Sequence, residues 1–503
     1  MRREGWCGSH DQEPPPTGKD RHVSSHRMTS TKRPVLPSHD DPMVKSVSTA
    51  IGGPVGSHVR LGASWWTPIR VMLLLVMLAS AVGIALDQPC RSEAWANDDN
   101  TQFSRGCYSD IVHLYWGRGI AEGIVPYVGD PTETGDEPIE YPVLTGVTMW
   151  VLSFGVPDDW SFDDRARLYF DINAIAIALL AAVAVWATAK TSGRRPWDAA
   201  MVAVAPGLIL ASTINWDMWA IALTSLAMLA WARRYPAMAG VLLGLAAAYK
   251  FYPLLLLGPL FVLCLRAGRM RSFVWVALGT AVTWFASNVP IMVANYEGWS
   301  RFYELSRERG ADFGSIWLVI DRTVTPLAPE RLNLWGVVAF ATLCLAIGLL
   351  GLLAPRRPRF AQLAFLTIAA FLVTNKVYSP QFVLWLIPLA ALARPRWRDF
   401  LSWQAAEAVY FFAVWWYIIA ADDAAKGLPD RFYYMAIGVH IFATVAYGLL
   451  VVRDVLKPEH DPVRASTGED DPGGGVLDGA PDRIGPGAVR KPSGAHASRL
   501  PTN

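Results

Sequence analysis

The first long apolar stretch of the chain is residues 69–88, IRVMLLLVMLASAVGIALDQ, and it decides the class of fold. Its length matches the ~20 residues that a helix needs to cross ~30 Å of hydrocarbon. Apolar blocks of similar length recur along the 503 residues, and 52% of the chain is hydrophobic whereas 17% is charged. The sequence therefore predicts an all-α polytopic membrane protein, a bundle of about 12 or 13 transmembrane helices.

The candidate spans are separated by short charged or Pro/Gly-containing connections. We place them at 69–88, 140–156, 168–189, 197–213, 216–232, 236–249, 252–266, 272–294, 333–353, 360–374, 380–393, 402–420 and 431–452. Several of them, such as 236–249, are too short to cross the bilayer alone. We expect these to tilt, break or lie behind other helices.

The orientation of the spans follows from Lys and Arg, because cytoplasmic loops retain positive charge. Basic residues gather at every second connection, namely at Lys190/Arg194/Arg195, Arg233/Arg234, Arg266/Arg269/Arg271, Arg356/Arg357/Arg359, Arg394/Arg396/Arg398 and Arg453/Lys457. The intervening connections are then extracytoplasmic: 89–139, 215–217, 250–253, 295–332, 375–381 and 421–431. If every block crossed fully, the C-terminal tail would face outward against its own charges. One block between 138 and 213 is therefore expected not to span, and 140–156 is the first candidate.

Both ends of the chain differ from the central region. Residues 1–67 and 456–503 are rich in Pro, Gly, Ser, Asp and Arg, so they are predicted to be disordered cytoplasmic tails. The transmembrane domain is thereby bounded to 68–455. The sequence has no P-loop, Rossmann or zinc pattern. We expect no cofactor, no metal ion and no nucleic-acid partner.

Two cysteines fall in the first extracytoplasmic loop. Cys90 and Cys107 lie on the oxidising side of the membrane, where a disulfide closing the loop and a pair of free thiols are both open. Cys264 and Cys344 lie in apolar runs and are expected to be packing residues.

The same loop contains the main candidate for catalysis, Asp110. It begins the segment DIVHLYWG, in which Ile111, Leu114 and Tyr115 repeat at helical spacing, so a short amphipathic helix is predicted at the membrane interface. The carboxylate of Asp110 is either a helix N-cap or a catalytic group. Glu140, at the entry to the next apolar block, is by itself typical of a solvated anchor.

These residues belong to a series of short motifs that resembles a known family. The series comprises Tyr108-Ser109-Asp110-Ile111, Leu114-Tyr115, Arg118-Gly119, Gly123, Pro126-Tyr127, Glu140-Tyr141-Pro142, Asn215-Trp216-Asp217, Gly244, Lys250-Phe251-Tyr252-Pro253, Gly314-Ser315-Ile316-Trp317 and Asn375-Lys376-Val377-Tyr378-Ser379-Pro380-Gln381. Over roughly 68–455 it is similar to membrane glycosyltransferases of the GT-C superfamily. Family 87, the actinobacterial polyprenol-phosphate-mannose-dependent α-mannosyltransferases, is the nearest group.

The resemblance implies a GT-C-type bundle whose first outer loop carries interfacial helices. It also implies a polyprenyl-phosphate sugar donor, with mannose as the family default, and a glycolipid or glycan acceptor at the extracytoplasmic face of the cell membrane. An inverting transfer needs a base for the acceptor hydroxyl, and Asp110 is the candidate. It needs no general acid, because phosphate is a good leaving group, but it needs cations to hold that phosphate.

Five basic residues are candidates for the phosphate contact. Lys250 and Lys376 end apolar runs on the outer side, where a lysine is costly unless it is paired or reaches the interface. Arg301, Arg307 and Arg309 lie in the 295–332 loop. For each the alternative is an interfacial anchor or a partner of a local acid.

Four further residues are candidates for substrate contact. They are Tyr108, Glu140, Asp217 and Trp317. Asp217 is expected either to orient the acceptor or to pair with a lysine, and Trp317 to stack on a sugar.

Two other classes of protein share these features. A transporter or flippase of lipid-linked sugars would also have many helices, outer carboxylates and interfacial lysines, but ionisable residues near mid-membrane and internal repeats are typical of it. A non-catalytic scaffold could retain the fold. The charges here gather at the ends of spans and no repeat is visible, which favours the enzyme.

Overall fold

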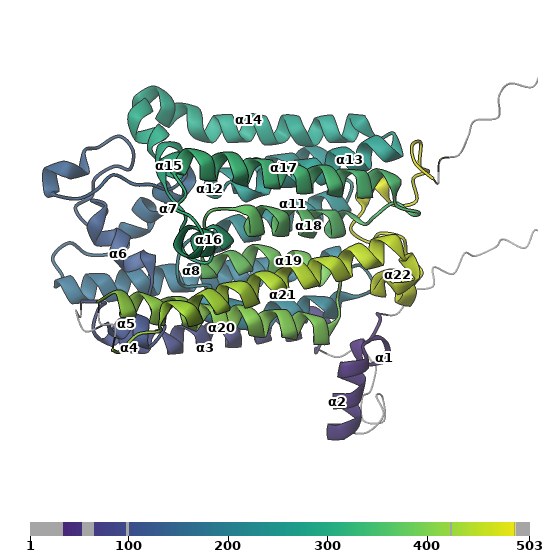
Figure 1. The fold of residues 1–503 in the computed structure, drawn as a ribbon, viewed down its shortest axis with the longest axis horizontal. Coiled ribbons are helices and arrows are strands. Elements are labelled where there is room, and N and C mark those ends of the chain that lie inside the picture. Colours follow the sequence, from purple (N-terminus) through teal and green to yellow (C-terminus); the bar gives the residue numbers. More distant parts are fainter. Residues whose placement is uncertain (1–33, 53–64, 97–99, 423–424, 487, 489–503) are drawn as a thin grey trace, which may run out of the picture. The chain divides into compact units, whose positions relative to one another are not determined.

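The structure is a computed structural model of the chain, and it describes residues 34–52, 65–96, 100–422, 425–486 and 488. These residues form helices joined by loops, and they contain no β-strand (Figure 1). Six of their helices are long and apolar enough to cross a membrane. They are α3 (Pro68–Leu86), α8 (Phe162–Thr191), α14 (Met270–Ala294), α17 (Pro329–Leu353), α20 (Trp397–Asp422) and α21 (Asp430–Leu456). The predicted all-α polytopic membrane fold is confirmed.

The remaining apolar blocks form shorter helices. They are α7 (Val143–Ser153), α11 (Asp217–Ala232), α12 (Pro236–Tyr249), α13 (Leu257–Ala267), α18 (Phe360–Thr374) and α19 (Val383–Ala393), of which α13 and α19 follow the 3-10 turns η3 (Tyr252–Leu256) and η4 (Pro380–Phe382). At 1.5 Å per residue each is roughly 16–24 Å long, less than the hydrocarbon thickness. Most side chains of α18 and α19 are buried. These helices therefore lie behind others, as expected for short blocks.

One predicted span is wrong. The block 197–213 is not a single helix but η2 (Pro196–Ala199), α9 (Ala200–Ala203) and α10 (Pro206–Ala211). Pro206 separates α9 from α10, because Ala205 before it takes an extended conformation (φ −61°, ψ 128°) that a continuous helix does not contain. Either this break or the short α7, which has 11 residues, is compatible with the one incomplete crossing expected between 138 and 213.

Glycine spacing brings α12 and α14 into direct backbone contact. A Cβ on Gly240 would overlap the carbonyl oxygen of Val276, and one on Gly244 would lie 2.5 Å from the carbonyl oxygen of Thr280. From α14, a Cβ on Gly279 would lie 2.7 Å from the carbonyl oxygen of Ala237. Small residues four apart let membrane helices approach in this way. The close packing fixes the end of α12, from which Lys250 projects.

Short helices gather at one end of the bundle (Figure 1). They comprise α4 (Gln88–Ser92), α5 (Thr101–Ser104), α6 (Asp110–Gly117), the 3-10 turn η1 (Pro131–Thr134), α15 (Tyr296–Glu308) and α16 (Ile316–Thr323). The first outer loop thus carries helices, as the resemblance implied. This is the end predicted to be extracytoplasmic.

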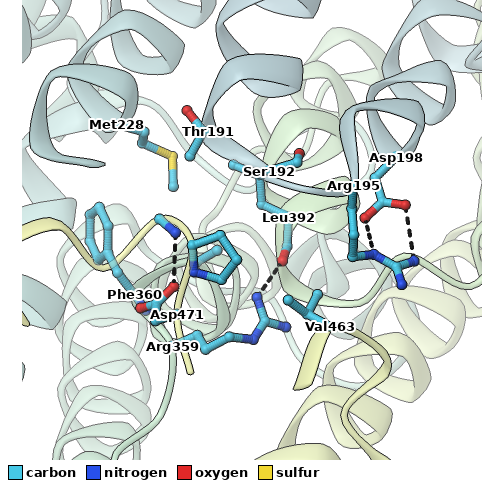
Figure 2. A pocket seen from close by; sticks show the side chains of 13 residues that line it. Thr191, Ser192, Arg195, Asp198, Met228, Arg359, Phe360, Leu392, Val463 and Asp471 are labelled. Atoms are coloured by element: carbon cyan, nitrogen blue, oxygen red, sulfur yellow. Dashed lines mark hydrogen bonds and ion pairs between the residues drawn. The ribbon is translucent and has the colours of Figure 1, made fainter. Parts of the chain in front are cut away.

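The opposite end is closed by the segment 457–486, which was predicted to be disordered. Instead it forms η5 (Pro458–His460), α22 (Pro462–Thr467) and η6 (Gly475–Leu477). The carboxylate of Asp461 accepts hydrogen bonds of 2.8 and 3.0 Å from the guanidinium of Arg359, and Asp471 accepts one of 2.9 Å from the amide of Phe360 (Figure 2). The cavity shown there has a volume of only about 20 Å³. The acidic residues that suggested disorder are ion-pair partners of arginines at the helix ends.

The N-terminal tail is also ordered in part. Residues 34–52 contain α1 (Pro37–Asp40) and α2 (Pro42–Gly52), and the Asp40 carboxylate lies 2.7 Å from the guanidinium of Arg195. The prediction of disorder is wrong for this stretch. Residues 1–33, 53–64, 487 and 489–503 of the predicted tails lie outside the described part of the chain.

Candidate active site

A cavity of about 720 Å³ lies at the end of the bundle where the short helices gather. Its walls come from the first outer loop, α15, the loop before α16, and the segments at the ends of α12 and α18. Six of the predicted site residues line it: Tyr108, Asp110, Glu140, Lys250, Arg309 and Lys376. Residues up to 268 positions apart in the chain, Tyr108 and Lys376, are therefore brought to one site.

Asp110 is not the N-cap of α6, as one alternative had it. Ser109 caps the helix: its hydroxyl accepts a hydrogen bond of 3.3 Å from the Ile111 amide and donates one of 2.7 Å to the carbonyl of Thr213. The Asp110 amide donates to the carbonyl of Ile214 at 2.8 Å. Because Ser109 fills the capping position, the Asp110 carboxylate is available to the cavity.

Two tyrosines hold the Asp110 carboxylate. The hydroxyl of Tyr108 donates to Oδ1 at 2.8 Å, and the hydroxyl of Tyr141 donates to Oδ2 at 2.9 Å. Burial raises the pKa of Asp110, and these two hydrogen bonds together with the charge of Lys250 oppose that rise. A carboxylate with a raised pKa, fixed through both oxygens, is a suitable proton acceptor for a hydroxyl placed in the cavity.

Lys250 is paired with Asp217. Its Nζ lies 2.8 Å from Asp217 Oδ1, and the side chains are 13% and 1% exposed. The other carboxylate oxygen accepts a hydrogen bond of 2.9 Å from Trp385 Nε1. Nζ also lies 4.7 Å from the centroid of the Tyr141 ring. Of the two alternatives for Asp217, pairing with a lysine is the one observed, and Asp217 holds Lys250 at the wall.

Lys376 binds the C-terminal end of α15. Its Nζ donates to the carbonyl oxygens of Arg307 (3.2 Å) and Arg309 (2.7 Å) and to Oδ1 of Asn333 (2.7 Å). A cation at a helix C-terminus is stabilised by the helix dipole. Burial and, secondarily, the charge of Arg309 lower the pKa of Lys376. All three acceptors are neutral, and within the described part of the chain Lys376 forms no ion pair, so its positive charge at the cavity wall is not balanced by a carboxylate.

The three arginines of the 295–332 loop separate in space. Arg309 lines the large cavity and lies 3.3 Å from the Asp312 carboxylate. The side chain of Arg307 is exposed and lines neither this cavity nor a neighbouring one; only its carbonyl contributes, to Lys376. Arg301 lines a second cavity. The structure therefore groups Arg309 alone with the two lysines, and it gives no support to a donor-phosphate contact for Arg301 or Arg307.

The other predicted substrate contacts also differ in placement. Glu140 accepts a hydrogen bond of 2.6 Å from Arg118, so at the cavity wall it is an ion-pair partner. Tyr108 packs on Trp415, with ring centroids 4.9 Å apart. Trp317 is outside the cavity wall, and its Nε1 donates to the carbonyl of Thr374 at 2.9 Å. The predicted stacking of Trp317 on a sugar has no geometric support.

Sequence reasoning missed several residues of the site. Tyr141 was present in a quoted motif, but nothing singled out its hydroxyl as a ligand of Asp110. The aromatic walls were missed too, since aromatic residues are common both in apolar spans and at membrane interfaces and carry no signal of a site there. They include Phe103, Tyr252, Phe302, Phe371, Phe382, Trp385 and Trp415. Among the described residues, no group of three or more His, Cys, Asp and Glu side chains is arranged to hold a metal ion.

A buried polar cluster supports one wall of the cavity. His440 of α21 lies 3.4 Å from the Glu407 carboxylate of α20, and its Nε2 lies 3.0 Å from the carbonyl oxygen of Gly314. Gly314 has φ +75°, and a Cβ there would overlap the carbonyl oxygen of Tyr378. Only glycine fits this close approach without strain. The cluster thus holds together the loops that carry Arg309 and Lys376.

The first outer loop is closed by a disulfide between Cys90 and Cys107, whose Cα atoms are 5.9 Å apart. We expect external thiol reagents to label neither residue in intact cells until a reductant is added. Mass spectrometry after alkylation measures this. Labelling of either cysteine without reductant would contradict the disulfide. Cys344, which forms no disulfide, is the control, because its labelling shows that the reagent has entered the membrane.

Long apolar helices, with a large cavity at one end of the bundle, are the features of a multi-pass membrane protein. The sequence model of glycosyltransferase family 87 matches residues 141–375, slightly less than half of the chain. This match agrees with the family to which the motifs pointed, and together with the apolar helices it supports a membrane glycosyltransferase. The matched segment contains Tyr141, Lys250 and Arg309; it begins after Asp110 and ends before Lys376. No curated protein matches the chain significantly.

Proposed function

We propose that the protein transfers a sugar, mannose, from a polyprenyl-phosphate donor to a glycolipid or glycan acceptor at the extracytoplasmic face of the cell membrane. One observation supports this most. The Asp110 carboxylate, which two tyrosines hold in place, lines a cavity of about 720 Å³. Three cationic side chains line the same cavity, those of Lys250, Arg309 and Lys376. A base and a phosphate-binding group are the two parts that such a transfer requires.

The transfer is a single displacement. Asp110 takes the proton of the acceptor hydroxyl while its oxygen attacks the anomeric carbon. The bond from that carbon to the phosphate oxygen breaks, and the electron pair leaves with the polyprenyl phosphate. The configuration of the anomeric carbon is inverted because only one displacement occurs.

The donor fits the large cavity in two respects. Its isoprenoid chain suits the aromatic walls, which include Phe371, Phe382 and Trp415. Its phosphate suits the positive charge of Lys376, whose three hydrogen-bond acceptors are neutral. A charge-assisted contact is stronger than one between neutral groups, which favours this end of the cavity for the phosphate.

One observation could support the alternative, a transporter of lipid-linked sugars: the buried pair Glu407 and His440 lies within helices α20 and α21. Such residues in membrane helices are often part of transport pathways. Here both are engaged with neighbouring groups: His440 contacts the Gly314 carbonyl, and Glu407 accepts from Trp403 Nε1 at 3.1 Å. These contacts favour a structural role for Glu407 and His440, and they therefore favour an enzyme over a transporter.

The test is transfer in proteoliposomes that contain the full chain. The donor is radiolabelled polyprenyl-phosphate mannose, and the acceptor is the lipid and lipoglycan extract of cells that lack the protein. We expect label in the extract, with the linkage opposite in anomeric configuration to the donor. Movement of the donor across the bilayer without any transfer would instead support the transporter.

Lys376 provides a separate test of the phosphate site. Replacing Lys376 with Met removes a charge-assisted contact worth roughly 1.5–3 kcal/mol, so the affinity for polyprenyl phosphate should fall by about tenfold or more. Binding is measured by equilibrium titration of purified protein. Lys376→Arg retains the charge and should bind more tightly than the Met variant. Lys190→Met, at the opposite end of the bundle, is the matched control.

If Lys376→Met binds polyprenyl phosphate as tightly as the wild type, Lys376 is only a cap for α15. A melting temperature for each variant separates loss of binding from loss of the cap.

A further inference from the structure

A second cavity, of about 400 Å³, adjoins the large one. It is bounded by the outer-loop segment 124–132 and by α15, and its volume is within the range of about 300–1,000 Å³ found for ligand pockets. Arg118 lines both cavities. The two cavities therefore meet at Arg118, whose partner Glu140 lies on the wall of the catalytic one.

Helix α15 is the partition between the cavities. Glu297, Arg301 and Glu304, which recur at helical spacing, line the second cavity. Phe302, Leu305 and Ser306 line the large one. One helix thus presents an apolar and aromatic face to the site proposed for the lipid donor and a charged face to its neighbour.

The outer wall of the second cavity is held in a strained conformation. Tyr127 has φ +68°, a left-handed conformation that costs a bulky residue of order 1–3 kcal/mol. Its hydroxyl donates to the Pro142 carbonyl at 2.8 Å and accepts from the Gly146 amide at 3.2 Å. A Cβ on Gly298 of α15 would overlap the Tyr127 carbonyl oxygen. The wall is therefore fixed to α15 and to the segment that follows Tyr141, the ligand of Asp110.

The charges of the second cavity do not suit a phosphate. Its walls carry three carboxylates, Asp130, Glu297 and Glu304, and two guanidinium groups. One of these, Arg118, is already paired with Glu140 and with a second glutamate at 3.1 Å. Sugar hydroxyls both donate and accept hydrogen bonds, so a wall of mixed carboxylates and guanidinium groups matches a neutral polyhydroxylated ligand.

We propose that the second cavity binds the hydrophilic glycan part of the acceptor and directs its reacting hydroxyl past Arg118 to Asp110. This inference rests on the proposed function and adds to it a place and a chemical class for the second substrate. It also gives Arg301 a different role from the phosphate contact predicted from the sequence. Among the described residues Arg301 forms no ion pair, so its guanidinium is available to sugar hydroxyls.

The test compares apparent KM values for the two substrates in the transfer assay described above. Arg301→Met and Glu304→Gln should each raise the KM for the acceptor extract by about tenfold, because each removes hydrogen bonds to a charged group. The KM for the donor and the kcat at saturating acceptor should stay within about twofold. Arg331→Met and Glu308→Gln, exposed residues that line neither cavity, are the matched controls and should leave both KM values unchanged.

The outcomes separate the two proposals. Absence of transfer by the wild-type protein overturns the proposed function and this inference with it. If the wild type transfers sugar and Arg301→Met raises the donor KM instead, the second cavity belongs to the donor. Unchanged KM values in both variants would likewise overturn the acceptor site while leaving the proposed function in place.

Discussion

Replacing Asp110 with Asn is expected to lower kcat by at least ~10²-fold, the lower end of the effect of losing a general base. The amide is nearly isosteric, and the hydroxyls of Tyr108 and Tyr141 can exchange donor and acceptor roles with it. The protein should therefore fold, insert and bind donor as before. Initial rates at saturating donor and acceptor measure the effect. Glu93→Gln, an exposed carboxylate of the same outer loop, is the control.

The pH dependence provides a second readout for the same residue. As the proposed base Asp110 must be deprotonated, and burial raises its pKa, so activity should fall as the pH decreases through a value above that of an ordinary aspartate. Tyr141→Phe removes a hydrogen bond that lowers the pKa, so the acid limb should move to higher pH. An Asp110→Asn variant with near-normal turnover would end the assignment of the base.

Replacing Lys250 with Met is expected to lower the free energy of unfolding by about 3–5 kcal/mol, the typical cost of removing one partner of a buried ion pair. The Asp217 carboxylate, with a side chain only 1% exposed, would lose its cation. The apparent melting temperature in detergent should fall markedly. Turnover should fall too, because a cation leaves the cavity wall.

A double variant distinguishes these two effects. Lys250→Met with Asp217→Asn removes the unpaired charge and retains an acceptor for Trp385 Nε1, so most of the lost stability should return. Turnover should stay low, because the cation is still missing. If Lys250→Met has the same melting temperature as the wild type, the ion pair is not important for stability. If the double variant regains activity, Lys250 has no part in the phosphate site.

The fold was largely predictable from apolar block length. The block 69–88 corresponds to α3 (Pro68–Leu86) within two residues at each end. The block 197–213 was not predicted correctly, because its composition is the same whether it forms one helix or three short pieces. Only the backbone restriction before Pro206 distinguishes them. The segment 457–486 was missed because its acids lie far in sequence from the arginines that order them.

The site was predictable where a single residue marked the outer end of a span. Lys250 and Lys376 were found in this way, Asp110 was found as the start of the interfacial helix, and all three line the cavity. Arg301 and Arg309 could not be told apart, because the face of α15 on which each lies depends on where that helix begins and how it is rotated. Tyr141 was missed because a hydrogen bond to a carboxylate 31 positions earlier leaves no local signal.

The packing of residues 457–486 onto the helix ends has a consequence for biogenesis. Arg266, Arg357 and Arg359, whose charges indicate the cytoplasmic side, are ion-paired in the folded protein with Asp482 and Asp461. Those acids follow α21, the last of the long apolar helices in the described part of the chain, so they emerge from the ribosome only after those helices have been synthesised. During insertion the arginines are thus unneutralised and can set the topology. In the folded protein the same arginines form the ion pairs that hold residues 457–486 against the end of the helix bundle.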